Sequence, residues 1–364
     1  MVVEWIIDNL GILSFIALVL AILLFKIASS LTEDRRKAAQ AKREQRWRKT
    51  FDRCRAAGSF RLTDRETARF SLSGMLIAFD ALNKTDDADA CAAVLRENSE
   101  AIVRRVSGRA DGTEKGYFAY ILSTADLASL PDDVRARYAA FMLKLLGADS
   151  VFCRENALKA LYHLGDAGAV AAAIETLSAD ARLHNEKLLA DGMNSFRGDQ
   201  RQLAAAMMER FDRYDDHSQS AVITFFTLAD FHDWDERFKA RLEDPAVSLD
   251  QRCDILRLLL KAPSPETKTL LVDTLRRKGH EPDWQTAAVA ATGLAAYPDD
   301  AEVIEALQSG VTSPAWSVRM NCAAALVRLA PPQEIIDGIL NGGDAFAADA
   351  MRFALHTNGS EDGI

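Results

Sequence analysis

The stretch RENALKALYHLGD, from Arg154 to Asp166, returns as a residue pattern through the second half of the chain. It places four apolar residues on one face of a helix: Ala157, Ala160, Leu161 and Leu164. Comparable stretches follow at intervals of 33, 33, 32, 34 and 33 residues, beginning near Lys187, Ser220, Arg252, Thr286 and Arg319. A steady period in this range is typical of stacked helical pairs. The sequence therefore predicts an array of helix pairs rather than one globular core.

The composition also favours an all-helical protein. Hydrophobic residues make up 49% of the 364 residues, and no segment shows the alternation of a β-strand. Five cysteines are scattered without paired spacing: Cys54, Cys91, Cys153, Cys253 and Cys322. Such an odd set is typical of buried thiols in a reducing compartment rather than of a disulfide framework.

The amino-terminal segment predicts a single transmembrane helix. Residues 9–25 carry no charge, and residues 9–28 would extend roughly 30 Å as a helix, which matches the hydrocarbon thickness of a bilayer. Glu4 and Asp8 precede the span and no Lys or Arg does, so we expect a retained anchor rather than a cleaved signal peptide. Residues 1–30 are assigned to this anchor, with residues 9–28 in contact with inner-membrane lipid.

A basic segment follows the predicted span. Residues 31–55 hold ten basic and four acidic side chains, which by the positive-inside rule places the carboxyl side in the cytoplasm. We therefore expect a single-pass cell-membrane protein with its amino terminus outside. Residues 31–58 are expected to form a basic juxtamembrane helix that lies on anionic lipid, packs on the first repeat or continues as a stalk. The candidate lipid-facing residues are Arg35, Arg36, Lys42, Arg43, Arg46, Trp47, Arg48 and Lys49.

The rest of the chain is acidic. Residues 56–364 carry a net charge of −14, because the whole chain carries −9, residues 1–30 carry −1 and residues 31–55 carry +6. This charge disfavours a nucleic-acid partner. Within residues 59–130, Thr63 and Glu66 form a capping box that opens a predicted helix through Leu82, and helices over residues 86–106 and 113–127 follow. These helices do not keep the period, and we interpret residues 59–130 as a divergent helical cap.

From Pro131 the predicted pairing becomes regular. Pro131 suits the first position of a helix that ends at Gly147, and its partner runs from Val151 to Leu164. Later Gly and Pro residues fall where the period needs a turn, and Gly108, Gly112 and Gly116 also read as loop punctuation. We expect the array to cover residues 131–356 and a disordered polar tail to cover residues 357–364.

Three stretches carry a resemblance to a known family. They are VFCRENALKALYHLGD at 151–166, EDPAVSLDQRCDILRLLL at 243–260 and TSPAWSVRMNCAAALVRL at 312–329. The last two have an Asp-Pro or Ser-Pro turn, and in all three a Val and an Arg open the second helix, as in HEAT repeats. The stretch at 151–166 is the closest match and also resembles the short bacterial variety named after phycobilisome lyases. The resemblance implies an α-α superhelix, a HEAT-like solenoid of armadillo type, that serves protein binding. It also implies that Arg154, Arg252 and Arg319 bond to the turn before their helix rather than to a ligand.

Candidate catalytic and metal-binding residues have structural alternatives that we favour. Carboxylates and two histidines gather at Asp212, Asp215, Asp216, His217, Asp230, His232, Asp233, Asp235 and Glu236. Such residues can hold a divalent metal, yet they fall at predicted helix ends, where Asp and His serve as caps. Some HEAT-type hydroxylases hold two irons with repeated His-Glu pairs, whereas this chain has the single pair His280-Glu281. Cys153, beside Arg154, could favour a thiolate, but we favour a small residue tucked under a neighbouring helix.

The predicted function is that of a scaffold rather than an enzyme. The array would hold a protein partner at the inner membrane, an example being a membrane enzyme such as a glycosyltransferase, and no cofactor is expected. Trp234, Trp284 and Trp316 are candidates to anchor the partner, with packing between repeats as the alternative. The alternative function is that of a HEAT-type lyase or metal-dependent enzyme.

Overall fold

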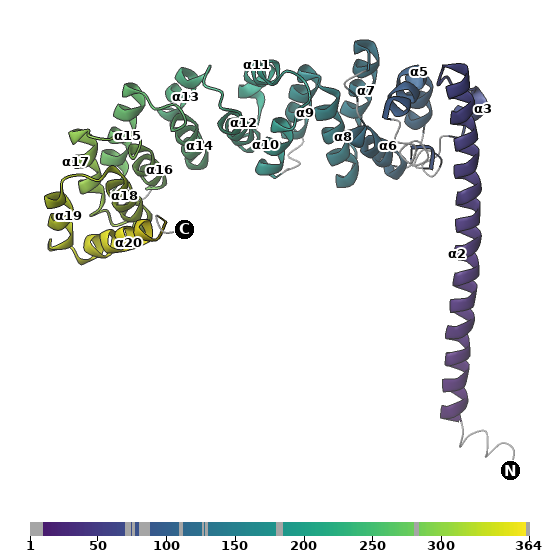
Figure 1. Cartoon of the computed structure of the whole chain (residues 1–364), viewed down its shortest axis with the longest axis horizontal. Coiled ribbons are helices and arrows are strands. Elements are labelled where there is room, and N and C mark those ends of the chain that lie inside the picture. The colour runs from purple at the N-terminus through teal and green to yellow at the C-terminus, as the bar shows by residue number, and fades with distance from the viewer. Residues whose placement is uncertain are drawn as a thin grey trace. The chain divides into compact units, whose positions relative to one another are not determined.

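The computed structural model describes residues 10–69, 74, 77–79, 88–108, 112–125, 127, 130–179, 185–279 and 284–361. Side chains are described for these residues except 10–25, 27–32, 88, 113, 114, 278 and 358–361. This part of the chain is helical and contains no β-strand (Figure 1). The predicted all-α class is therefore confirmed.

Internal contacts divide the chain into two compact units, residues 1–169 and 170–364, called here unit 1 and unit 2. The helices of unit 1 are α2 Leu10–Ala57, α3 Asp64–Thr67, α5 Ala88–Ser107, α6 Gly112–Thr124, α7 Asp132–Leu145 and α8 Val151–Leu164. Helix α9 Ala167–Ala179 contains the division. Unit 2 continues with α10 Glu186–Asn194, α11 Gln200–Arg210, the 3-10 helix η1 Phe211–Arg213, α12 Asp216–Ala229, α13 Asp235–Leu242, α14 Leu249–Leu259, α15 Pro265–Lys278, α16 Gln285–Leu294, α17 Ala301–Gly310, α18 Trp316–Leu329, α19 Gln333–Leu340 and α20 Ala345–Glu361.

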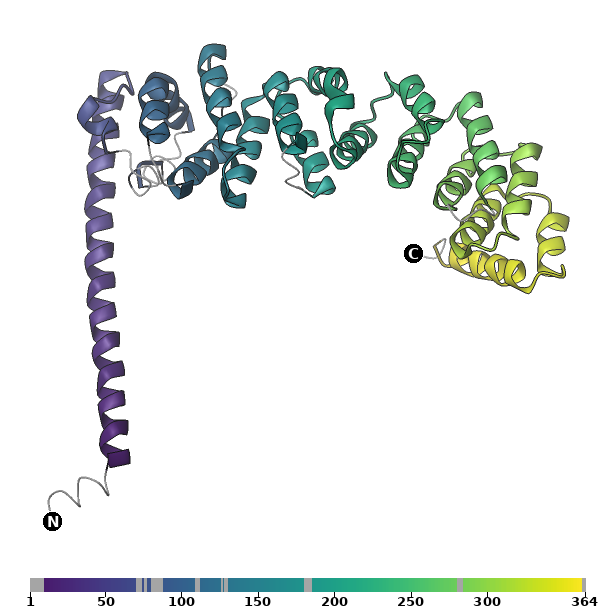
Figure 2. The same ribbon diagram turned by 180° about the vertical axis from the view of Figure 1, so that it is seen from behind.

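Helix α2 is one continuous helix of 48 residues (Figure 2). At 1.5 Å per residue it is about 72 Å long. It ends at Gly58, whose φ of +64° lies in the left-handed region that favours glycine at a helix end. The side chains of residues 33–43 are all exposed, so α2 extends well beyond the helices on which its carboxyl-terminal end packs.

The predicted transmembrane span is not tested by the described residues. Among these residues, no helix is both long enough and apolar enough to cross a bilayer. Asn9 and the side chains of residues 10–25, 27 and 28, which make up most of the predicted span, lie outside the described part. The span remains a prediction from the sequence.

Unit 1 contains two stacked helix pairs. Helix α5 packs on α7, α6 packs on α8, and α7 packs on its own partner α8. Gly116 lies inside α6, not in the loop that the sequence predicts, because α6 and α8 approach closely there. A Cβ atom on Gly116 would come within 2.9 Å of the Phe152 ring and 3.3 Å of the Cys153 Cα. The first pair falls within the predicted cap, yet it stacks in the same way as the second.

Helix α3 begins as predicted and ends early. Thr63 and Glu66 form the predicted capping box. The helix nevertheless ends at Thr67 and a turn follows at Ala68 and Arg69, whereas the sequence predicts one helix through Leu82. Residues 74 and 77–79 are again helical, and residues 70–73, 75, 76 and 80–82 lie outside the described part. The Thr67 hydroxyl donates to the carbonyls of Thr63 and Asp64, and the Arg105 guanidinium donates to the Ala68 carbonyl at 2.9 Å. The Thr63 and Asp64 carbonyls also accept backbone N–H groups within α3, whereas the Ala68 carbonyl is one that a longer helix would use.

Unit 2 stacks helix pairs in two rows. The second helices α10, α12, α14, α16, α18 and α20 each pack on the next, and α13/α14, α15/α16, α17/α18 and α19/α20 are hairpins. Figure 1 shows α15, α17 and α19 as the other row. One buried cluster of mainly Ala, Val and Leu side chains continues from α14 to α20. The second helices from α8 to α18 begin 35, 30, 33, 36 and 31 residues apart, so the predicted period is kept on average while the turns vary in length.

Side-chain caps and left-handed residues set the helix ends. Asn185, Asp199, Asp215, Ser248, Ser264 and Asp300 each accept a hydrogen bond from the first turn of the following helix. Gly165 ends α8 with a φ of 70°, as predicted. Pro131 is the cap of α7 rather than its first residue. Helix α20 continues to Glu361, past the start of the predicted disordered tail, and residues 362–364 lie outside the described part.

Candidate partner-binding surfaces

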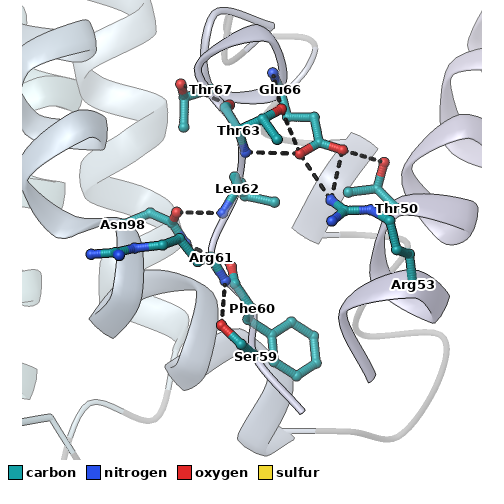
Figure 3. Close-up of polar contacts among 10 residues, drawn as sticks. All are labelled: Thr50, Arg53, Ser59, Phe60, Arg61, Leu62, Thr63, Glu66, Thr67 and Asn98. Atoms are coloured by element: carbon teal, nitrogen blue, oxygen red, sulfur yellow. Dashed lines mark hydrogen bonds and ion pairs between the residues drawn. The ribbon is translucent and has the colours of Figure 1, made fainter. Parts of the chain in front are cut away.

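A polar network joins the end of α2 to α3 and α5 (Figure 3). Asn98 on α5 accepts from the Leu62 backbone N–H at 2.8 Å and donates to the Phe60 carbonyl at 2.9 Å. The Arg53 guanidinium on α2 donates to both carboxylate oxygens of Glu66 at 2.9 Å. Together these contacts fix the segment between α2 and α3 on both sides. We call this set, with the apolar contacts below it, the α2 junction.

The apolar part of the α2 junction is a buried stripe on α2. Trp47, Phe51 and Cys54 have exposed fractions of 5%, 1% and 0%. The Trp47 and Phe51 rings stack with centroids 5.6 Å apart, and Phe51 also lies beside Phe60. Packing is therefore the role of this stripe. Trp47, which the sequence marked as a candidate to face lipid, lies in the protein interior, because α2 uses this face against the rest of unit 1.

Glu66 is the charged centre of the α2 junction. Burial raises the pKa of its carboxyl group, but hydrogen bonds from Thr63 and the charge of Arg53 outweigh burial and hold the pKa below its usual value. Glu66 accepts from the Thr63 backbone N–H at 2.9 Å and from the Thr63 hydroxyl at 2.8 Å. The ionised form of Glu66 is thus the form that stabilises the junction.

The remaining candidates for lipid contact are exposed on α2. They are Arg35, Arg36, Lys42, Arg43, Arg46, Arg48 and Lys49. Arg48 pairs with Glu44 at 2.7 Å on its own helix, as Lys37 does with Glu33. No ion pair within the described part of the chain involves Arg35, Lys42, Arg46 or Lys49.

The three candidate tryptophans lie in three different environments. Trp234 is half-buried, with its ring centroid 5.2 Å from that of Phe226. Trp284 is half-buried against the core cluster of unit 2. Trp316, at the start of α18, is 66% exposed. The packing alternative therefore describes Trp234 and Trp284, and Trp316 alone offers most of its ring to a partner.

Two exposed phenylalanines lie on the helix that packs against α18. Phe346 and Phe353 on α20 are 70% and 57% exposed, and the Arg319 guanidinium of α18 lies over the Phe346 ring, 5.4 Å from its centroid. We call Trp316, Phe346 and Phe353 the aromatic patch. Exposed aromatic rings of this kind are typical anchors in protein interfaces. Phe346 and Phe353 were not among the predicted site residues, although their spacing of seven on a helix whose other face is Ala and Met is a readable signal.

The repeated arginines bond to the turns that precede their helices, as the resemblance implied. Arg154 donates to the carbonyls of Ala148 and Asp149, both at 2.8 Å. Arg319 donates to the carbonyl of Ser313 at 2.6 Å, and Arg252 to that of Asp244 at 2.8 Å. These arginines therefore stabilise turns.

The acidic and histidine residues of the candidate metal site form caps and ion pairs instead. Asp215 caps α12 and Asp230 ends it in the left-handed conformation. Asp212 pairs with Arg237 and Arg241 at 2.6 and 3.2 Å. No group of three potential metal ligands occurs among the described residues, and His280-Glu281 lies outside them.

His232 and Asp235 form a separate pair in the same region. The His232 Nδ1 lies 3.0 Å from a carboxylate oxygen of Asp235. Burial raises the pKa of Asp235, while the neighbouring His232 acts in the opposite direction. This pair lies at the start of α13 and holds the loop between α12 and α13.

Cys153 is a packing residue. It is fully buried and lies under α6 at the close approach to Gly116. Burial raises the pKa of its thiol, against the lowering effect of Lys115 and Arg154. The thiol form is therefore favoured, and the predicted small residue beneath a neighbouring helix is confirmed.

Unit 2 also contains an open pocket of about 290 Å³ between α14, α15 and α16. Its lining is mixed, with Arg252 and Arg277 as cations and Glu243 as an anion. The Arg252 guanidinium in its wall donates to the Asp244 carbonyl.

Comparison with family models, with characterised proteins and with solved structures found no match for this chain. The resemblance to HEAT repeats therefore rests on the three stretches quoted above.

Proposed function

We propose that this chain is a single-pass membrane protein whose helix pairs form a HEAT-like solenoid that holds a protein partner at the inner membrane. The amino terminus lies outside and the helical body lies in the cytoplasm. The protein acts by binding and by raising the local concentration of its partner, without catalysis. A membrane enzyme, such as a glycosyltransferase, is the partner class that we propose, because it shares the plane to which the anchor confines the body.

The observation that carries this proposal is the continuity of α2. One helix runs from the apolar sequence at residue 10 to the α2 junction at residue 57. Because the junction fixes α2 through Trp47, Phe51 and the Arg53–Glu66 pair, we expect the exposed segment between the predicted span and the α2 junction to act as a stalk. A projecting helix of this kind favours the hypothesis of a tether over that of a helix lying flat on lipid.

The aromatic patch supports the binding part of the proposal. Exposure of Trp316 and Phe346 costs hydration free energy in a chain with no partner, and large exposed apolar groups commonly mark interaction sites. The stacked pairs place this patch on the last helices of unit 2, at residues whose replacement would leave the core cluster in place.

Two measurements on the full chain test the proposed function. Alkaline carbonate extraction of membranes should retain the wild type and release a variant with Leu18→Arg and Leu20→Arg in the predicted span, because arginine at a bilayer centre is costly. Photo-cross-linking from position 316 should give a protein adduct that the Phe346→Ala variant weakens, with a cross-linker at exposed Arg104 of unit 1 as the matched control. A wild type released by carbonate, or adducts that are equal at both positions, would contradict the proposal.

A further inference from the structure

Four cations of α2 lie on one face of the helix. Arg35, Lys42, Arg46 and Lys49 are separated by seven, four and three residues, which are the spacings that return to the same side of an α-helix. All four are exposed, and none has an ion pair in the described part of the chain. We call them the basic stripe. It extends over about 21 Å of helix.

The other cations of this region are neutralised or face elsewhere. Lys37 pairs with Glu33 at 2.7 Å and Arg48 with Glu44 at 2.7 Å, on the side of α2 away from the basic stripe. Arg53 continues the stripe toward unit 1, but it pairs with Glu66. Acidic residues thus pair with Lys37, Arg48 and Arg53 of α2, whereas the four cations of the basic stripe have no ion pair in the described part of the chain.

The basic stripe is separate from the face that holds α2 to unit 1. Trp47, Phe51 and Cys54 are buried in the α2 junction, and the helical positions of the stripe lie roughly a third of a turn away from them. A ligand along the stripe therefore needs no rearrangement of the junction.

The distance of each cation from the hydrocarbon edge of the membrane distinguishes lipid from protein as the ligand. This distance rests on the proposed anchor. With the predicted span ending at Ala28, the four cations lie about 10, 21, 27 and 32 Å along the helix from the hydrocarbon edge. The headgroup layer is about 5–8 Å deep and the screening length in physiological salt is about 8 Å. Lys42, Arg46 and Lys49 therefore lie beyond the effective field of an anionic membrane.

We infer that the basic stripe binds an acidic helix of the protein partner. A straight row of cations on a straight helix matches Asp and Glu side chains at helical spacing on a second helix lying alongside. Ala38 and Ala39, both exposed, flank the stripe and let another backbone approach closely. The stripe offers little apolar area, so the association is electrostatic and weakens as salt rises.

The test uses the full chain in its own membranes, with a photo-cross-linking residue in place of Ala38. The expected adduct is with a protein segment that carries Asp or Glu at helical spacing, and its yield falls in high salt. Arg46→Glu with Lys49→Glu should lower the yield about tenfold or more, because two attractive charge pairs become repulsive. Exchanging acidic residues of the cross-linked segment for lysine should restore it.

A second pair of substitutions controls for charge alone. Lys37→Glu with Arg48→Glu makes the same change in net charge on the other side of α2 and should leave the yield within about twofold, since exposed pairs contribute little. Adducts with lipid only, with a second copy of this chain only, or with no molecule would overturn the inference. So would an equal loss in both double variants. Loss of the wild-type chain from the membrane fraction is scored separately, because it would overturn the proposed anchor.

Discussion

Basic side chains have opposite roles in α2 and in the helix pairs. Arg154, Arg252 and Arg319 each follow a turn and donate to its carbonyl oxygens. Arg35 and Arg46 lie in the middle of a long helix, where every nearby carbonyl is already bonded within the helix. Arginine thus stabilises turns in the helix pairs and is available to bind a partner in α2.

The position of an arginine relative to a helix end therefore decides which groups it can bind. A turn leaves carbonyl oxygens without partners, and a guanidinium five or six residues later reaches them. Away from a turn the guanidinium pairs with an acid on the same helix, as Arg48 does, or on a neighbouring helix, as Arg53 does, or it stays available to a ligand from outside. The two regions also differ in packing, since the pairs of unit 2 share a buried core and residues 33–43 of α2 have exposed side chains.

The largest expected loss of stability comes from a substitution in the close packing of unit 2. A Cβ atom on Gly310 would come 2.4 Å from the Cys322 sulfur and 3.2 Å from Leu275. Gly310→Ala should therefore destabilise unit 2 by up to about 3 kcal/mol. Hydrogen exchange of the amides in α17 and α18 measures the loss. The control is Gly338→Ala in α19, where a Cβ meets nothing within 4 Å and better helix propensity should stabilise by up to about 1 kcal/mol. Equal effects of the two substitutions would contradict the close packing.

The arginine side of the comparison predicts a smaller loss. Arg154→Ala removes two charge-assisted hydrogen bonds to the turn before α8 and should cost roughly 1.5–2 kcal/mol. Arg46→Ala on α2 should change stability by less than about 0.5 kcal/mol, because this exposed side chain has no partner in the described residues. Urea unfolding of unit 1, followed by hydrogen exchange in α8, compares the two. A cost for Arg46 as large as that for Arg154 would remove the distinction between the regions.

The smallest effect is expected at the α2 junction and depends on pH. The pKa of Glu66 is lowered in the folded chain, so its contribution to stability is present above the ordinary value of 4.5 and is lost as the pH falls through the folded value. The fluorine resonance of 5-fluorotryptophan at position 47, assigned with Trp47→Phe, should therefore shift as the junction loosens in acid. Glu66→Gln should weaken the junction at neutral pH and remove this pH dependence. A resonance that moves identically in both chains would assign the change to another group.

Several elements could be predicted from local patterns. The capping box of Thr63 and Glu66, the glycine that ends α8 and the arginines that bond to turns all depend on residues no more than eight positions apart along the chain. The early end of α3 was missed, because Arg105 from α5 takes the carbonyl of Ala68. The position of Gly116 in a close helix contact was missed for the same reason, since Phe152 lies 36 residues later.

The burial of the candidate site residues likewise depends on contacts with distant parts of the chain. The sequence marked all three tryptophans as equals, and it placed Trp47 among residues that face lipid. The structure leaves Trp316 exposed, half-buries Trp234 and Trp284, and buries Trp47 against unit 1. Asn98, which joins α5 to the segment before α3, gave no local signal, because its partners Phe60 and Leu62 lie 38 and 36 residues earlier.

Local sequence patterns were enough to predict a helical chain, second helices that recur on average every 33 residues from α8 to α18, and the arginines that follow a turn. These properties arise from the 3.6-residue repeat and from hydrogen bonds to nearby backbone groups. Only the tertiary structure decided which aromatic rings are covered and which face of α2 stays free for its four cations. Burial of a ring depends on which distant helix packs against it, and residue order alone does not specify that contact.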